Sequence, residues 1–292
     1  MPTKTLAVTS PATTRRRLRA ELRRMREAVG LSQAQVVAKL DWSQSKLIRI
    51  ENGSVGISVT DARAMLSLYG APADLGDDLI ELARSSRART WWSGYREVLS
   101  PQHQEFIGFE ADAARLRQFH PSMVPGLLQT ESYIRALLPS MVLSPLSEST
   151  YDSLLEVRLR RQAEVLGGEN PPEYTVVLDE AVLRRPVGGV SAMREQLEHL
   201  AKMQNHETVS IAVLPFSAGP HIGMAGAFEL MQFDDDVDDD ILYLESIQGD
   251  MALRDRPEIV AKYGEQFDSL LARSLSGGAA VDYLFKVGQE LA

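Results

Sequence analysis

Residues 32–53, SQAQVVAKLDWSQSKLIRIENG, constrain the fold of this chain more than any other stretch. They contain two short runs that begin at Ser32 and Ser43, and serine commonly accepts a backbone hydrogen bond at the N-terminus of a helix. Leu40-Asp41-Trp42 lies between the two runs. Two short helices joined by a turn of about three or four residues form a helix-turn-helix. The stretch therefore predicts a small all-α module near the N-terminal end.

Helices are also predicted on both sides of this pair. In residues 15–30, apolar residues recur every three or four positions, which places them on one face of a helix that Gly30 ends. Seven arginines occupy the other faces against two glutamates, so we expect an anion near them rather than only solvent. A fourth helix is predicted to begin at Ser58 or Thr60. The apolar residues of the first helix are Leu18, Leu22, Met25 and Val29.

Charge divides the chain into two parts. The 292 residues carry a formal net charge of −9, and a chain of this length predicts two domains. Residues 1–70 hold 12 Lys/Arg and 5 Asp/Glu, a net charge of +7. The remaining residues hold 19 Lys/Arg and 35 Asp/Glu, a net charge of −16. This split predicts a basic module that meets a polyanion, joined to an acidic body that does not.

The composition excludes several classes of protein. The chain has no cysteine, so disulfide frameworks, thiolate metal sites and cysteine nucleophiles are excluded. No apolar run reaches the roughly 18–20 residues that a membrane span needs. Residues 1–14, MPTKTLAVTSPATT, lack a secretory core and are predicted to be a disordered tail. We therefore expect a cytoplasmic protein that is not bound to a membrane and uses no cofactor or metal.

The geometry of a helix-turn-helix predicts which side chains reach DNA. The N-terminal turn of its second helix enters the major groove, where arginine suits guanine and glutamine suits adenine. Helix N-termini bind phosphate, and arginines on the first helix would contact phosphates without reading sequence. The alternative for Gln44 and Lys46 is plain surface. The predicted DNA contacts are Gln33, Ser43, Gln44, Ser45, Lys46 and Arg49, with Arg15, Arg16 and Arg19 at phosphates.

The helix-turn-helix resembles the lambda-repressor-like (XRE) family over about residues 15–70. Two positions depart from the family's pattern: Val37 stands where alanine is frequent, and Asp41 where glycine is usual. Aspartate tolerates the left-handed conformation better than most residues, so the turn is expected to survive. The resemblance implies sequence-specific binding of double-stranded DNA. The matching positions are Leu31-Ser32-Gln33, Ser43, Leu47, Ile50, Glu51 and Gly53.

The rest of the chain predicts an α+β body behind an all-α helix-turn-helix domain at residues 15–72. Residues 73–100 are predicted to be a helical linker, and residues 101–292 the larger domain. Adjacent strands flanked by helices favour an α+β fold with a mainly antiparallel sheet. Strands are predicted over 173–180, 208–216, 226–233 and 241–246. Helices are predicted over 151–167, 191–204, 256–275 and 278–292, and a further one from the spacing of Phe109, Ala113, Leu116 and Phe119.

Several phrases of the second domain resemble the C-terminal domain of actinobacterial, WhiJ-like regulators. The resemblance implies a transcriptional regulator of differentiation, antibiotic production or a toxin–antitoxin-like pair. It also implies a small partner protein encoded by a neighbouring gene. The phrases are FEADAARLRQFHPSMVPGLLQT, RRQAEVL, VVLDEAVLRRPVGG, MREQLEHL, VLPFSAGPHIGMAGAFELMQF and YLES, in order over about residues 91–255.

No constellation of catalytic residues stands out, and we expect no enzymatic activity. Residues 233–240, FDDDVDDD, lack the glycine and the terminal glutamate of an EF-hand loop, so a solvated hairpin turn is expected. Asp179-Glu180 lies just before Arg184-Arg185, which favours ion pairs or helix capping over acid–base catalysis. His221 lies in a glycine-rich loop without a second histidine at metal-binding spacing.

Three segments are candidates for a ligand or partner site: the tryptophan pair, VPGLLQT at 124–130 and LPFSAGPHIGMAG at 214–226. If these segments converge, they line a pocket or a partner groove. The alternatives are packing at a domain junction for the tryptophans and packing on the sheet edge for the loops. The candidate residues are Trp91, Trp92, Pro125, Leu127, Leu128, Phe216 and His221.

Together these features predict a sequence-specific DNA-binding transcriptional regulator. Its acidic domain would supply dimerisation, respond to a small-molecule effector or a protein partner, or both. A homodimer is expected because one module buries only roughly 600–1,000 Å² on DNA, and its two-fold axis predicts an inverted-repeat operator. The alternative is an antitoxin-like interaction protein that binds a small partner and uses DNA binding for autoregulation. The operator, the sign of regulation, the effector and the dimer interface stay open.

Overall fold

The structure is a computed structural model, and it describes residues 10–51, 55–142, 144–234, 240–245, 251–254 and 256–291. The chain folds into two compact units. The first contains the described residues up to Gly94 together with Gln104–Asp112. The second contains Tyr95–His103 and the described residues from Ala113 onward.

The first unit is helical and contains the predicted helix-turn-helix. Its core includes Val36 of the second helix, Leu47 of the third and Met65 of the fourth, all 0% exposed. Apolar residues every three or four positions give each helix one buried face, and these faces meet in a shared core. The helices are α1 (Pro11–Ala28), α2 (Gln33–Leu40), α3 (Gln44–Glu51), α4 (Val59–Tyr69) and α5 (Ala73–Ser85), followed by η1 (Trp91–Tyr95) and α6 (Pro101–Asp112).

Both ends of α2 use the signals expected from the sequence. Ser32 and Gln35 form a capping box: the Ser32 side chain accepts from Gln35 N, and the Gln35 side chain accepts from Ser32 N at 2.8 Å. Asp41 ends the helix in the left-handed conformation, with φ 53° and ψ 45°. Among the described residues other than glycine, Asp41 alone has a positive φ. The turn therefore keeps the geometry that glycine would favour, with aspartate in its place.

α1 begins earlier than the predicted helix. Residues 1–9 of the predicted tail lie outside the described residues, whereas residues 11–14 form the first turn of α1. Ser10 caps this turn, and its backbone N–H donates to both carboxylate oxygens of Asp112 at 2.9 and 2.8 Å. Because Asp112 lies about a hundred positions away, no local pattern in residues 1–14 announces this contact.

α5 packs against α1 and α4, and α6 approaches the start of α1. Leu79 and Ala83 of α5 are at most 2% exposed and belong to the core of the first unit. In α6, a Cβ added to Gly108 would lie only 2.6 Å from the Cβ of Ala12, so α1 and α6 approach closely there. The segment predicted as a linker, residues 73–100, therefore supplies part of the first unit's core.

The second unit is built on a mixed six-stranded sheet with the order β3-β2-β1-β4-β5-β6. β1 pairs with β2 in parallel and β2 with β3 in parallel, while β1–β4, β4–β5 and β5–β6 are antiparallel. The predicted α+β class is confirmed, and most of the pairings are antiparallel as expected. The strands are β1 (Arg115–His120), β2 (Glu173–Asp179), β3 (Val209–Leu214), β4 (Phe228–Gln232), β5 (Ile241–Glu245) and β6 (Met251–Arg254).

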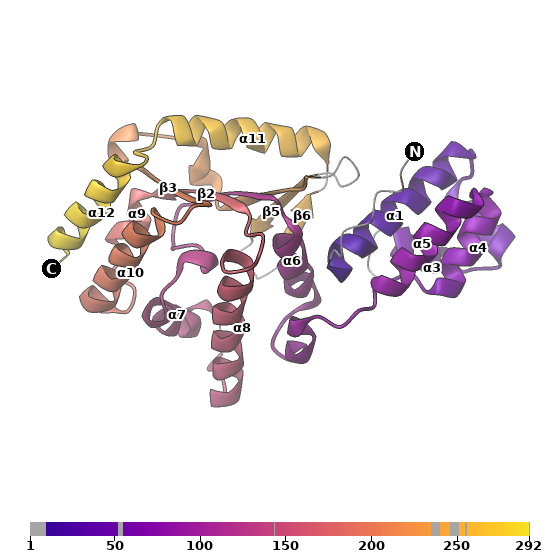
Figure 1. Cartoon of the computed structure of the whole chain (residues 1–292), viewed down its shortest axis with the longest axis horizontal. Helices are drawn as coiled ribbons and strands as arrows, with labels where there is room; N and C mark the ends of the chain where they lie inside the picture. The colour runs from indigo at the N-terminus through magenta and orange to yellow at the C-terminus, as the bar shows by residue number, and fades with distance from the viewer. Residues whose placement is uncertain are drawn as a thin grey trace. The chain divides into compact units, whose positions relative to one another are not determined.

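Helices cover both faces of this sheet. α11 lies along one face, where Phe119, Phe228 and Phe267 share a core. α7, α8 and α10 lie on the other face, as Figure 1 shows. α12 packs against α10. The helices of the unit are α7 (Glu131–Leu137), α8 (Glu148–Leu166), α9 (Glu180–Arg184), α10 (Gly189–Met203), α11 (Pro257–Ala272) and α12 (Gly278–Glu290), with short turns η2 (Gly126–Leu128), η3 (Leu138–Met141), η4 (Phe216–Ala218) and η5 (Ile222–Ala225).

The predicted helix through Phe109 and Phe119 is wrong in its second half. α6 ends at Asp112, and residues 115–120 form β1. Leu116 and Phe119 are both 0% exposed, yet in a strand residues three apart point to opposite faces. Each side chain is buried by the helices on a different face of the sheet. Two buried residues three positions apart in the sequence therefore resembled the apolar face of one helix. The edge strand β6 also lies outside the predicted strands.

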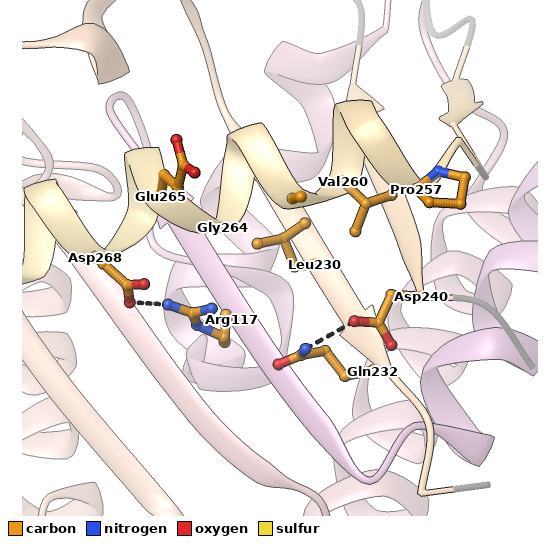
Figure 2. A pocket seen from close by; sticks show the side chains of 10 residues that line it. Arg117, Leu230, Gln232, Asp240, Pro257, Val260, Gly264, Glu265 and Asp268 are labelled. Atoms are coloured by element: carbon orange, nitrogen blue, oxygen red, sulfur yellow. Dashed lines mark hydrogen bonds and ion pairs between the residues drawn. The ribbon is translucent and has the colours of Figure 1, made fainter. Parts of the chain in front are cut away.

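A groove of about 460 Å³ lies between α11 and the sheet (Figure 2). Pro257, Val260 and Gly264 line it from the helix. Arg117 of β1 and Leu230 of β4 line it from the strands. The helix therefore covers its face of the sheet incompletely, and a space bounded by both polar and apolar side chains remains.

Candidate nucleic-acid interface

A buried ion pair joins α1 to α3. Arg26 Nε lies 2.6 Å from Glu51 Oε1, and Arg26 Nη2 lies 3.2 Å from Glu51 Oε2. The two side chains are only 10% and 7% exposed. Arg26 Nη1 also donates to the Leu31 carbonyl at 2.9 Å, just before α2. A two-pronged pair of this kind fixes orientation as well as distance, so it holds all three helices in register.

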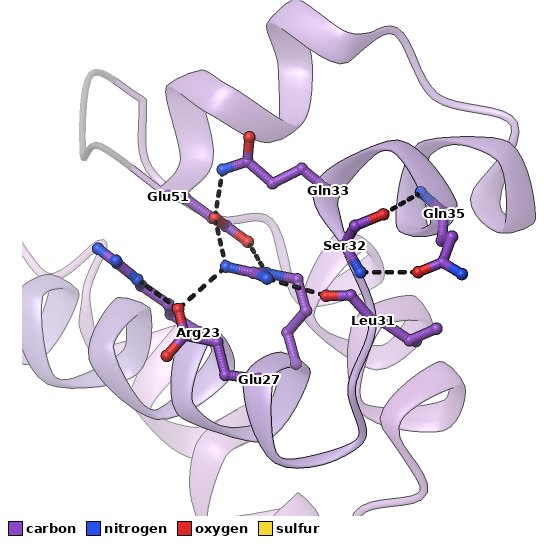
Figure 3. Close-up of polar contacts among 8 residues, drawn as sticks. Arg23, Glu27, Leu31, Ser32, Gln33, Gln35 and Glu51 are labelled. Atoms are coloured by element: carbon purple, nitrogen blue, oxygen red, sulfur yellow. Dashed lines mark hydrogen bonds and ion pairs between the residues drawn. The ribbon is translucent and has the colours of Figure 1, made fainter.

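Gln33 is held by the same carboxylate. Its Nε2 donates to Glu51 Oε2 at 2.6 Å, and the residue is half-buried at the first position of α2 (Figure 3). The N-terminus of a helix attracts anions because its first backbone N–H groups have no partner within the helix. Glu51 therefore positions the amide of Gln33 where a phosphate is predicted to bind.

α3 presents one polar strip to solvent. Gln44, Ser45 and Arg49 are exposed, while Leu47 and Ile50 face the core at no more than 3% exposure. Arg49 Nε donates to the Ser45 carbonyl at 3.2 Å, which directs its side chain back along the strip. The spacing of the buried residues predicts which positions remain outside. These three predicted DNA contacts therefore lie together on one helix surface.

Ile48 belongs to the same strip and is missing from the predicted contacts. Its side chain is 39% exposed, one turn beyond Gln44. An exposed apolar side chain in a major groove contacts the methyl group of thymine. The sequence contains a signal for Ile48, because a residue four positions after Gln44 lies on the same helix face. The prediction omitted it because an isoleucine between Leu47 and Ile50 is typical of a core residue.

Ser43 and Lys46, which are predicted to contact DNA, also make contacts that stabilise the fold. Ser43 Oγ accepts from Lys46 N at 3.2 Å and so caps α3. Lys46 Nζ lies 2.6 Å from Asp61 Oδ1 of α4 and 3.8 Å from the centre of the Trp42 ring. The ammonium group is therefore turned toward α4 and the turn, and Lys46 is a weaker candidate for a base contact than its neighbours.

The predicted phosphate contacts on α1 are not brought together with α3's N-terminal strip. Arg16 is only 5% exposed, so the prediction that it contacts phosphate is wrong for this conformation. Arg15 Nη1 donates to the Ser86 carbonyl at 3.2 Å, and burial lowers its pKa although Glu105 opposes this. Arg15 and Arg19 line a small pocket with Val55, beyond the other end of α3. Arg16 is buried and Arg15 is half-buried because other helices cover α1 on more than one side.

The predicted ligand segments of the second unit lie apart. Leu127 and Leu128 are at most 3% exposed, Pro125 is buried, and η2 packs against α8 and α10. η5, in the loop with Phe216 and His221, instead contacts α11 on the opposite face of the sheet. The prediction that these two segments form one pocket is therefore wrong. Trp91 and Trp92 belong to the first unit, where their rings meet edge to face at 5.4 Å.

The loop that carries Phe216 and His221 is firmly anchored. His221 Nε2 lies 3.1 Å from Asp179 Oδ2, and Phe216 N donates to Glu180 Oε2 at 2.7 Å. Glu180 also pairs with Arg184 at 2.5 Å, which confirms the expected ion pair. Burial would raise the pKa of Glu180, but the hydrogen bonds from Phe216 N and Arg184 outweigh it and lower the pKa. His221 therefore anchors a loop.

The chain matches two known families. Residues 17–79 match a family described as a helix-turn-helix domain, and residues 103–285 match one described as a domain of unknown function, DUF5753. No curated protein and no solved structure matches the chain. Within the part of the chain that the structure describes, no helix is long and apolar enough to cross a membrane, and no three His, Cys, Asp or Glu side chains gather as metal ligands. The helix-turn-helix match supports a DNA-binding regulator.

Proposed function

Since the chain belongs to the DUF5753 family and carries a helix-turn-helix domain, we propose that it is a sequence-specific transcription regulator. The finer description is a lambda-repressor-like DNA-binding domain on a WhiJ-like regulator, without enzymatic activity. The observation that carries the proposal is the exposed strip of Gln44, Ser45, Ile48 and Arg49 on α3. Its hydrogen-bonding groups and its one apolar side chain suit base edges in a major groove.

The proposed regulator binds DNA as a homodimer. One helix-turn-helix buries too little surface for tight specific binding, and a two-fold dimer reads two half-sites about one or two helical turns apart. α12 is one candidate for part of the dimer contact, although its Leu284 is 1% exposed and the helix packs against α10. Phe285 is 50% exposed on the outer side of α12 and supports a contact there.

The test is fluorescence anisotropy of the full chain against its own upstream region and a shuffled duplex, at two salt concentrations. Tighter binding to the upstream duplex, weakening steeply with salt, is expected because phosphate contacts release counterions. Equal and weak binding to both duplexes at both salt concentrations would overturn sequence-specific recognition by the free chain.

An antitoxin-like interaction protein is the second candidate, and the anchored loop favours it. Phe216, Ile222 and Met224 are 57%, 51% and 72% exposed on that loop. Hydrophobic side chains that a rigid loop holds in solvent mark interaction sites. The partner would be a small protein encoded by a neighbouring gene, and its binding would be the second unit's main task.

Co-expression of the chain with the neighbouring small protein tests this candidate. Co-purification is expected to be lost when Ile222 and Met224 are both replaced by serine. Met141→Ser is the control, because it removes an apolar side chain that is 43% exposed on η3, away from the loop. Co-purification that both variants retain equally would exclude the loop as the partner site.

A further inference from the structure

The groove between α11 and the sheet is a formed space, and one glycine keeps it open. Gly264 faces the groove from the middle of α11, and a Cβ added there would lie 3.8 Å from Arg117 Nη1. Any larger side chain at this position would extend into the space beside Arg117. An alanine Cβ would make only ordinary van der Waals contact there, so Gly264 keeps longer side chains out of the groove.

The floor of the groove is apolar. Leu230 of β4 is 2% exposed and Val260 of α11 is 7% exposed, and both side chains line the groove in Figure 2. Pro257 extends the same surface toward the start of α11. A ligand with a hydrocarbon or aromatic body would bury its own apolar surface against Leu230 and Val260, whose side chains are already almost fully buried.

Arg117 is a wall of the groove and is already engaged. Its guanidinium pairs with Asp268 (Figure 2). It also lies 4.6 Å from the centre of the Phe267 ring. The Arg117 side chain is only 22% exposed. An anionic ligand would have to displace Asp268 from this pair. The charge of Arg117 is therefore largely neutralised before any ligand arrives.

Two other carboxylates give the groove its net charge. Asp240 and Glu265 line it, and no cation pairs with either of them among the described residues. The amide Nε2 of Gln232 donates to Asp240 Oδ2 at 2.8 Å, which fixes the direction of that carboxylate (Figure 2). With Arg117 and Asp268 cancelling each other, the lining carries a formal charge of −2 over an apolar floor.

We propose that this groove binds an organic cation with an apolar body, such as an aromatic amidine or an amine on a short hydrocarbon skeleton. The apolar body lies on Leu230 and Val260. The cationic group lies at Asp240, because an ionised acceptor gives the strongest hydrogen bonds. The Glu265 carboxylate points to the outer side of α11 in Figure 2 and adds negative charge only at the rim. The inference deepens the proposed function by naming the chemistry of the effector site, and only the regulatory role of the ligand rests on that proposal.

Isothermal titration calorimetry of the full chain, without DNA, tests the site with three probes of one shape. Benzamidine carries the cation, benzamide is its neutral counterpart, and benzoate is the anion. Saturable binding is expected for benzamidine, with benzamide at least about tenfold weaker, because losing a charged hydrogen bond costs about 1.5–3 kcal/mol and 1.4 kcal/mol is tenfold in affinity. Benzoate is expected to bind more weakly than either.

Three variants locate the binding. Asp240→Asn is expected to weaken benzamidine binding about tenfold or more. Glu265→Gln, whose carboxylate points away from the sheet, is expected to weaken it much less. Gly264→Leu is expected to abolish binding by filling the groove, while leucine suits a helix better than glycine does. Glu258→Gln removes a carboxylate from the same helix outside the groove lining and is expected to change nothing. Circular dichroism checks that each variant folds.

Several outcomes would overturn the proposal. They are benzoate binding more tightly than benzamidine, equal binding of benzamidine and benzamide, and no heat from any probe. Benzamidine binding that survives both Asp240→Asn and Gly264→Leu would also overturn it. Anisotropy of the same preparations on the upstream duplex is a separate readout. Loss of probe binding with intact DNA binding would contradict the groove proposal alone, whereas loss of DNA binding would contradict the proposed regulator.

Discussion

The two units differ in where their polar residues lie. In the first unit, core residues and outward-facing residues alternate along α3, so Leu47 and Ile50 fix the direction of Gln44 and Arg49. In the second unit, the described side chains of β1–β5 are largely buried, and the distinctive surfaces come from an anchored loop and a groove. In the first unit the core pattern also specifies the surface that is proposed to meet DNA. In the second unit the core pattern specifies the sheet but not the loop or the groove.

The largest expected effect comes from the ion pair at the centre of the first unit. Glu51→Gln leaves Arg26 buried without its counter-charge, which should cost about 3–5 kcal/mol in free energy of unfolding. Hydrogen exchange measures this: amides of α1–α3 should lose protection while those of β1–β3 keep it. Glu81→Gln is the control, because the Glu81–Arg84 pair is 65% and 55% exposed and should contribute at most about 1 kcal/mol. Equal loss of protection in both units would show that they unfold together.

Acid should destabilise the second unit through His120. This side chain is 4% exposed, its Nδ1 accepts from Met123 N at 3.2 Å, and burial lowers its pKa to about 4. Between its ordinary pKa of about 6.5 and 4, the unfolded state binds a proton that the folded state does not, so stability falls as pH falls. The loss should approach roughly 3 kcal/mol at most.

Urea unfolding at pH 7 and pH 5, followed by probes in the second unit, measures this loss. His120→Asn keeps an acceptor oxygen near Met123 N and does not titrate, so its stability should vary less with pH. Identical pH dependence in the variant and the natural chain would exclude His120 as the cause.

Arg49→Ala tests whether α3 of the first unit reads DNA sequence. It should weaken binding to the specific site by about 1–3 kcal/mol and relax the sequence preference, with little effect on a shuffled duplex. Arg24→Ala removes a 73% exposed arginine of α1 and should have a smaller effect that is equal on both duplexes. Anisotropy on the two duplexes separates these outcomes. Equal losses on specific and shuffled DNA for Arg49→Ala would show that α3 does not read sequence.

The smallest effect is expected at the turn after α2. Asp41 has a φ of 53°, where most side chains are strained by about 1–2 kcal/mol but glycine is not. Asp41→Ala should therefore lower the stability of the first unit by roughly 1 kcal/mol, whereas Asp41→Gly should be close to neutral. Thermal unfolding of the two variants compares them directly. Greater stability of the alanine variant would contradict this account of the turn.

Much of the fold was predictable where short-range signals decide structure. Serine caps and the αL turn at Asp41 mark the helices of the first unit within a few residues. β1 was missed because both of its neighbours, β2 and β4, are distant in sequence. RLRQFH also carries two arginines, so it does not read as a buried central strand. A strand of this kind is defined by pairings that no local window contains.

The candidate site was predictable to the same extent and for the same reason. Helical spacing placed Gln44, Ser45 and Arg49 on one exposed strip. The burial of Arg16 and the Lys46–Asp61 pair depend on how other helices pack, so residue type alone could not reveal them. In the second unit, Leu127 in a glycine- and proline-bounded loop has the same sequence signature whether it lines a pocket or, as here, the core.

The division of the chain has a consequence for its synthesis. Every described residue of the first unit precedes Ala113, whereas β1 must wait for β4, at Phe228–Gln232, before both of its edges are paired. Domains made first generally fold first on the ribosome. The first unit, with its helix-turn-helix, can therefore be folded while most of the acidic second unit is still untranslated. A product of stalled translation that ends soon after Asp112 would carry the DNA-binding helices without the unit proposed to govern them.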